Sequence, residues 1–89
     1  MTYRVLFTDE AKKQLKKIDK HIAALILGWI RKNLEGCTNP RQHGKCLKAN
    51  RLGQWRYRVG DYRLIAKIED EKIIILILNI GHRRDVYDK

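Results

Sequence analysis

The central segment of this 89-residue chain, residues 54–65, reads QWRYRVGDYRLI. Apolar or aromatic residues alternate with arginines on both sides of Gly60-Asp61, as in two half-buried strands joined by a tight turn. Glycine in the first position of a two-residue turn favours type II′, because it accepts a positive φ without steric cost. The sequence therefore predicts a hairpin of two strands, Gln54–Val59 and Tyr62–Glu69.

This turn also predicts the register of the hairpin, with Arg58 directly opposite Arg63. Because side chains alternate along a strand, Arg56 joins these two on one face, while Trp55 and Tyr57 point into the core. Like charges placed opposite each other destabilise a sheet. The three arginines, here called the arginine face, are either a solvated surface with tolerated repulsion or a site for an anion. The lack of nearby acids favours the anion site.

A first strand is predicted over residues 2–8, where Tyr3, Val5 and Phe7 alternate with polar or mixed neighbours. Thr8 suits the N-cap of a following helix, whose first turn is acidic. The chain is thus expected to enter a helix directly from the first strand.

Two helices are predicted before Gly36, with a break near Asp19-Lys20. Each has apolar residues on one face, and the first carries lysines elsewhere. The expected core positions are Ala11, Leu15 and Ile18 in the first helix and Ile22, Leu25, Ile26, Trp29 and Ile30 in the second.

Residues 36–53 read as a loop with a short turn around Lys45–Leu47. Asp70-Glu71 is expected to join the hairpin to a last strand, Lys72–Ile80, which is apolar at nearly every position and so predicted to be central and covered on both faces. Gly81 would then permit a turn. Residues 1–89 therefore predict one small α+β domain in the order β-α-α-β-β-β, with a helical hairpin on one face of a mainly antiparallel sheet.

The charge of the chain predicts its kind of partner. Twenty Lys and Arg residues against ten Asp and Glu give a net charge of +10. Residues 36–60 contain no acid at all, although Arg41, Lys45, Lys48 and Arg51 lie there beside the arginine face. Since solvated surfaces normally mix both signs, this segment is expected to bind a polyanion or an acidic protein.

Several classes of function are disfavoured. The longest apolar run is too short to span a membrane, and the N-terminus lacks the pattern of a signal peptide, so a cytoplasmic location without membrane contact is expected. Cys37, His43 and Cys46 are one ligand short of a structural zinc site and wrongly spaced. No metal or other cofactor is predicted.

RNA cleavage is one reaction for which these cationic residues can be considered. Cleavage of RNA by its own 2′-hydroxyl needs a base, positive charge around the phosphate and an acid for the leaving 5′-oxygen. Arginine binds phosphate through two parallel N–H donors but stays protonated. The base is therefore expected to be either Tyr87, among cations that lower its pKa, or His82, since histidine exchanges protons near neutral pH.

Three segments, NPRQHGKCLK (39–48), WRYRVGDYRLI (55–65) and IGHRRDVY (80–87), together with the order of elements, resemble the RelE toxins of the RelE/ParE superfamily. The likeness spans nearly the whole chain. It implies the toxin of a type II toxin–antitoxin system, an mRNA endoribonuclease that cuts the message in the ribosomal A site and inhibits translation. It also implies a cognate antitoxin, which the net charge of +10 predicts to be acidic, with operator DNA bound only through the toxin–antitoxin complex.

The resemblance assigns residues as well. It implies a stabilising contact to phosphate from Arg63 and proton transfer by the C-terminal arginine and tyrosine. It also adds His43 to the RNA-binding candidates, which from the basic segments themselves are Arg41, Lys45, Lys48, Arg51 and Arg84. The implied catalytic set is Arg56, Arg58, Arg63, His82, Arg83 and Tyr87. Members of the family often have lysine where this chain has Arg56 and Arg58, so proton abstraction shifts to Tyr87 or His82.

Two other functions compete with this one. A ParE-like toxin would inhibit DNA gyrase by surface complementarity without cutting RNA, and a plain RNA-binding module would need only the basic face. The joint presence of Arg63, Arg83 and Tyr87 favours the nuclease, because neither alternative requires all three.

Overall fold

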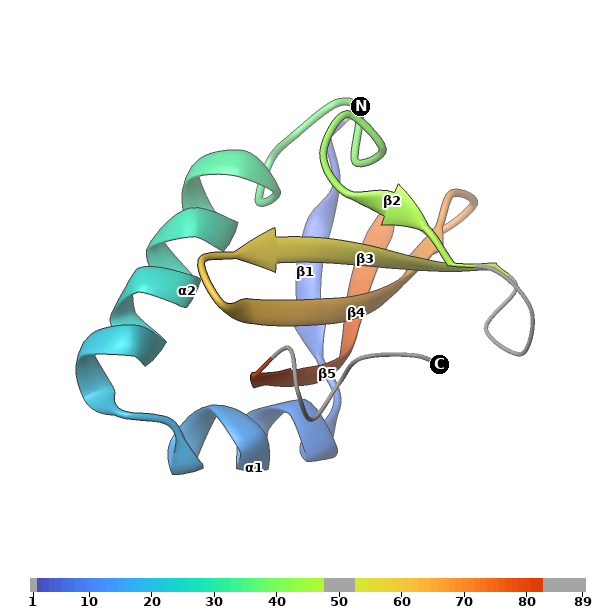
Figure 1. Ribbon diagram of the computed structural model, residues 1–89. Coiled ribbons are helices and arrows are strands. Elements are labelled where there is room, and N and C mark those ends of the chain that lie inside the picture. Colours follow the sequence, from blue (N-terminus) through green and yellow to red (C-terminus); the bar gives the residue numbers. More distant parts are fainter. Residues whose placement is uncertain (1, 48–52, 83–89) are drawn as a thin grey trace.

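The computed structural model describes residues 2–47 and 53–82. Figure 1 shows two helices packed beside a five-stranded sheet. The strands lie in the order β1-β5-β4-β3-β2, and all neighbours are antiparallel except β1 and β5. The predicted α+β class and mainly antiparallel sheet are confirmed. The elements are β1 (Arg4–Phe7), α1 (Asp9–Lys17), α2 (Lys20–Asn33), β2 (Lys45–Cys46), β3 (Gln54–Val59), β4 (Tyr62–Glu69) and β5 (Ile74–His82).

The β3–β4 hairpin has the predicted register. Val59 pairs with Tyr62, and Arg58 pairs with Arg63. Gly60 has a φ of 61°, and the φ of Asp61 is not positive. A type II′ turn requires this combination. The local turn chemistry thus places the arginines opposite each other.

The helices begin where the sequence predicts. The Thr8 hydroxyl accepts a hydrogen bond from the Ala11 amide at 3.1 Å, and the Asp19 carboxylate caps α2 by accepting one from the His21 amide at 3.0 Å. One predicted core position is wrong: Leu25 is 69% exposed, because it lies beyond the edge of the stripe that faces the sheet. Neither described helix has the length and apolarity to cross a bilayer.

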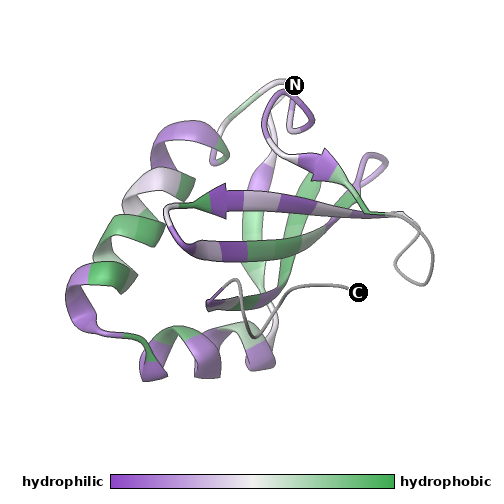
Figure 2. Ribbon diagram, viewed as in Figure 1, coloured by the Kyte–Doolittle hydropathy of each residue, from purple (hydrophilic) through white to green (hydrophobic). Residues whose placement is uncertain are grey.

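The main core lies between the helices and one face of the sheet. Figure 2 shows the apolar residues concentrated in β1, β5 and parts of α2. The buried cluster is Ala11, Ile26, Ile30, Leu34, Tyr57, Leu64, Ala66, Ile75, Ile77 and Ile80, with Trp55 packed against it. The expected inward direction of Trp55 and Tyr57 is confirmed, and the arginine face is therefore the opposite face of the sheet.

The last strand differs from the prediction in three ways. β5 begins at Ile74, so a four-residue loop, residues 70–73, replaces the expected two-residue turn. Ile73 adopts a φ of 57° in this loop, a conformation that no local pattern predicts for a β-branched residue. Gly81 lies inside β5 and forms no turn. Finally, β5 was expected to be covered on both faces. It is buried on the side that faces the helices and only half-buried on the other side.

The segment expected to form a turn near residue 45 is the short strand β2. Lys45 pairs with Arg56, and Cys46 pairs with Trp55. The amide of Leu47 also donates to the Gln54 carbonyl at 2.9 Å. Backbone pairing with a distant strand overrides the local turn signals, so the order becomes β-α-α-β-β-β-β.

α1 covers the edge of β5 that extends beyond β1. A bulge in β5 leaves Leu78 unpaired with β4. Its carbonyl accepts a hydrogen bond from the Thr8 hydroxyl at 3.0 Å, and the Ile80 amide donates to the Gln14 side chain at 2.6 Å. These contacts hold the end of β5, from which the C-terminal site candidates follow, against α1.

Candidate functional site

The arginine face lies on the central strands of the sheet. Arg63 on β4 sits between Arg58 on β3 and Gly81 on β5. Arg63 is only 8% exposed, Arg56 is half-buried and Arg58 is exposed. The predicted grouping of the three arginines on one face is confirmed.

The burial of Arg63 gives its guanidinium a defined position. The pair of Arg63 on the neighbouring strand β5 is Gly81, which has no side chain. A guanidinium held in place offers two parallel N–H donors to a phosphate with little loss of conformational freedom. This geometry suits binding of charge that develops on a phosphoryl group.

His82 lies on the other face of the sheet. It pairs with Tyr62 on β4, which pairs in turn with Val59 on β3. The rings of His82 and Tyr62 meet edge to face, with their centroids 5.5 Å apart. A pocket of about 370 Å³ contains His82 together with Gln14 and Asp19 from the α1 side. The helix-side position of His82 counts against its acting as the base for a phosphate held on the arginine face.

Arg41 forms an ion pair that the sequence did not reveal. Its guanidinium contacts both oxygens of Asp70, at 3.0 and 2.9 Å, and the Tyr3 hydroxyl donates to Asp70 at 2.6 Å. These hydrogen bonds, first from Arg41 and then from Tyr3, lower the pKa of Asp70 from 3.8 to about 2. Arg41 thereby joins its loop to the β4–β5 loop, which counts against the expected role as an independent phosphate ligand.

The Asp70 contacts predict a dependence of stability on acid. Because the pKa of Asp70 is lower in the folded chain, its contribution is present above pH 3.8 and is lost as the pH falls towards 2. Both side chains are about half exposed, at 44% and 54%, so solvent screening keeps the effect small. We expect Asp70→Asn to flatten the pH profile of the melting temperature between about pH 4 and pH 2.

Arg41→Ala is the second arm of this experiment, since it removes the same ion pair from the other side. It should flatten the same part of the profile. A wild-type slope in both variants would show that the ion pair does not contribute to acid sensitivity.

The loop before β2 is fastened to the hairpin through the core aromatics. Trp55 Nε1 donates to the His43 carbonyl and the Tyr57 hydroxyl donates to the Pro40 carbonyl, both at 2.6 Å. Burial raises the pKa of Tyr57 well above its ordinary value, so it remains a neutral donor. Gly44 has a φ of 80°, and a Cβ there would collide with the Arg56 carbonyl oxygen. The close approach of the loop to β3 therefore requires glycine.

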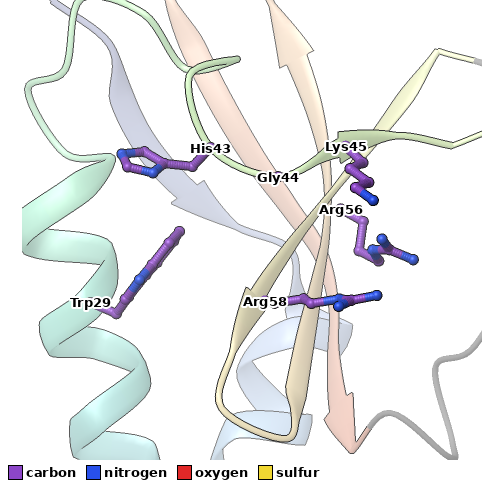
Figure 3. Close-up of a pocket in the computed structure, with 6 residues that line it drawn as sticks. All are labelled: Trp29, His43, Gly44, Lys45, Arg56 and Arg58. Atoms are coloured by element: carbon purple, nitrogen blue, oxygen red, sulfur yellow. The ribbon is translucent and has the colours of Figure 1, made fainter.

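A second pocket, of about 300 Å³, opens where this loop meets β3. Figure 3 shows the rings of Trp29 and His43 near each other, while the side chains of Lys45 and Arg58 extend on the other side of β3. The sequence placed Trp29 only in the core stripe of a helix, and an aromatic residue there carries no local signal of a site. The lining residues are Trp29, His43, Gly44, Lys45, Arg56 and Arg58.

The other predicted site residues, Lys48, Arg51, Arg83, Arg84 and Tyr87, lie outside the described residues. Within the described ranges, no three His, Cys, Asp or Glu side chains are grouped as metal ligands. Cys37 and Cys46 are both unpaired thiols.

Comparison with known proteins gives one family. Residues 5–87 match the family described as the ParE toxin of type II toxin-antitoxin system, parDE. Toxin RelG of Mycobacterium tuberculosis is 34% identical over 87 residues, which cover 98% of each chain.

Solved structures agree with this assignment. The toxin–antitoxin complex RelBE2 of Mycobacterium tuberculosis contains a chain of 32% identity with a TM-score of 0.84, and the match covers 93% of both chains. The archaeal RelE–RelB complex of Pyrococcus horikoshii contains one of 31% identity with a TM-score of 0.70, covering 93% of this chain and 97% of that one.

Proposed function

This chain belongs to the RelE/ParE superfamily of type II toxins, and we propose that it is a ribosome-dependent endoribonuclease that cuts mRNA in the A site and so inhibits translation in the cytoplasm. The observation that carries the proposal is the buried Arg63 directly opposite the exposed Arg58 on one face of the sheet. A toxin that only bound a protein surface would not need a cation held in this way.

The reaction we propose is internal transesterification. The 2′-oxygen loses its proton to a base and attacks the adjacent phosphorus. The bond to the 5′-oxygen breaks, and this oxygen takes a proton, which leaves a 2′,3′-cyclic phosphate and a 5′-hydroxyl. Arg63 and Arg58 would stabilise the negative charge on the phosphorane. Tyr87 is the proposed base and Arg83 its partner in proton transfer, while Arg56 supplies further positive charge.

Cleavage of ribosome-bound message is expected to be far faster than cleavage of the same RNA in solution. The arginine face supplies cations suited to a phosphate but no ordinary acid–base pair, so the proposed reaction needs a message already held in line for attack. Such positioning supplies roughly 7–11 kcal/mol of a barrier. Primer extension measures the cleavage rate of a message bound to stalled ribosomes and of naked RNA with the same sequence. Equal rates on the two substrates would contradict the proposed dependence on the ribosome.

We propose a RelB-type antitoxin as the cognate partner, because the two solved structures described above, from Mycobacterium tuberculosis and Pyrococcus horikoshii, are complexes of this kind. The net charge of +10 calls for an acidic partner. Operator DNA would be bound only by the toxin–antitoxin complex.

Association with the antitoxin is expected to be fast at low salt and to slow down steeply as salt is added. Charges around an interface act mainly on the association rate, and salt screens them. Stopped-flow mixing with the purified cognate antitoxin gives this rate. An association rate that stays constant from low to high salt would exclude electrostatic steering.

The ParE description of the matched family favours one alternative, inhibition of DNA gyrase without RNA cleavage. A supercoiling assay with purified gyrase separates the two. We expect no inhibition of gyrase at toxin concentrations that cleave ribosome-bound message.

A further inference from the structure

The pocket in Figure 3 lies at an open edge of the sheet. β2 pairs only with Trp55 and Arg56, so the remainder of β3, from Tyr57 onwards, has no neighbouring strand there among the described residues. In a hairpin with a two-residue turn, the backbone groups of Arg58 point away from β4. The pocket is therefore bordered by a strand edge as well as by side chains.

One part of the pocket is aromatic. Trp29 and His43 have ring centroids 5.7 Å apart and meet edge to face, and both are half-buried. The ring of Trp29 also packs against the ring of Tyr57, with a centroid distance of 5.8 Å. A supported indole that retains accessible surface is suited to stacking, because little conformational freedom is lost when a ring lies on it.

The other part is cationic. Lys45 on β2 pairs with Arg56, and Arg58 follows on the same face of β3. No carboxylate is among the lining residues. Lys45 and Arg58 are exposed, so their charges are accessible to a ligand that reaches the edge of the strand.

We propose that this pocket binds one nucleotide of single-stranded RNA, its base against Trp29 and its phosphate towards Lys45 and Arg58. The inference rests on the proposed function and adds a substrate subsite to it. Every base has a π-face, so an aromatic platform beside cations binds single strands with little dependence on sequence. Arg58 belongs to both the pocket and the arginine face, so a strand in the pocket leads directly to Arg63.

A binding titration without cleavage tests the pocket separately from the nuclease. The probe is a short 2′-O-methyl oligoribonucleotide, which has no 2′-hydroxyl able to attack. The chain has two tryptophans, Trp29 and Trp55, and Trp55 does not line the pocket. We expect the oligonucleotide to quench the fluorescence of the wild-type chain but not that of Trp29→Leu. Binding by this variant should be about 5- to 150-fold weaker, which corresponds to loss of one stacked base.

Two further variants separate stacking from loss of packing. Trp29→Tyr keeps an aromatic platform and should restore most of the affinity. Lys45→Ala should lower the slope of log affinity against log salt by about one unit, whereas Lys16→Ala, an exposed lysine of α1, should leave the slope unchanged. Melting temperatures identify any variant that is not folded at the assay temperature.

Wild-type affinity in folded Trp29→Leu would overturn the subsite. So would quenching of Trp29 by an acidic peptide but not by the oligonucleotide, since the pocket would then be a protein-binding site. Binding that depends on Trp29, in a chain that fails to cut ribosome-bound message, would support the subsite and reject the proposed nuclease.

Discussion

Replacing Arg63 with alanine is expected to slow single-turnover cleavage of ribosome-bound message by about 10²–10³-fold. The guanidinium is buried between Arg58 and Gly81, so its donors are held in place before the phosphate becomes more negative. Fixed donors contribute most when charge develops during the reaction. The effect should therefore appear in the cleavage rate at saturating toxin.

The controls use the same strand and the same residue. Lys67→Ala removes an exposed cation from the arginine side of β4 and should cleave like the wild type. Arg63→Lys keeps the charge but loses the bidentate donors, and an intermediate rate is expected. Because Arg63 is buried, each rate is measured below the melting temperature of its variant. Wild-type cleavage by folded Arg63→Ala would remove the arginine face from the mechanism.

Tyr87→Phe is expected to lower the same rate by about 10²–10⁴-fold. The substitution keeps the aromatic ring and deletes the hydroxyl that we propose as the base. Tyr87 lies outside the described residues, so its assignment rests on the resemblance of IGHRRDVY to RelE toxins. The pH profile of the rate provides a second readout, since loss of the base should remove the ascending limb.

His82→Ala is the matched comparison, because the sequence left both residues open as the base. The side chain of His82 packs on Tyr62 and lies on the helix side of the sheet. We therefore expect a much smaller loss of activity than in Tyr87→Phe. The reverse order of the two losses would make His82 the base and would require the message to reach the helix side.

The predictions from sequence were most accurate where structure depends on nearest neighbours. The Gly60-Asp61 turn, the pairing of Arg58 with Arg63 and the Thr8 cap all follow from local turn or capping chemistry. The predictions failed where contacts between distant segments compete with local turn or capping chemistry. β2 forms because Lys45 and Cys46 pair with β3. The positive φ of Ile73 belongs to a loop in which Asp70 is bonded to side chains of two distant segments.

The hairpin, the inward direction of Tyr57 and the gathering of arginines on one face all follow from local sequence, because strand alternation and turn type set them. The contacts that surround these groups depend instead on how distant segments pack together. The tertiary structure pairs Arg41 with Asp70, 29 residues away, and it brings Trp29 from α2 to the edge of β3. Such contacts depend on the packing of whole elements, and no periodicity or motif along a chain encodes a distance between two residues that meet only after folding.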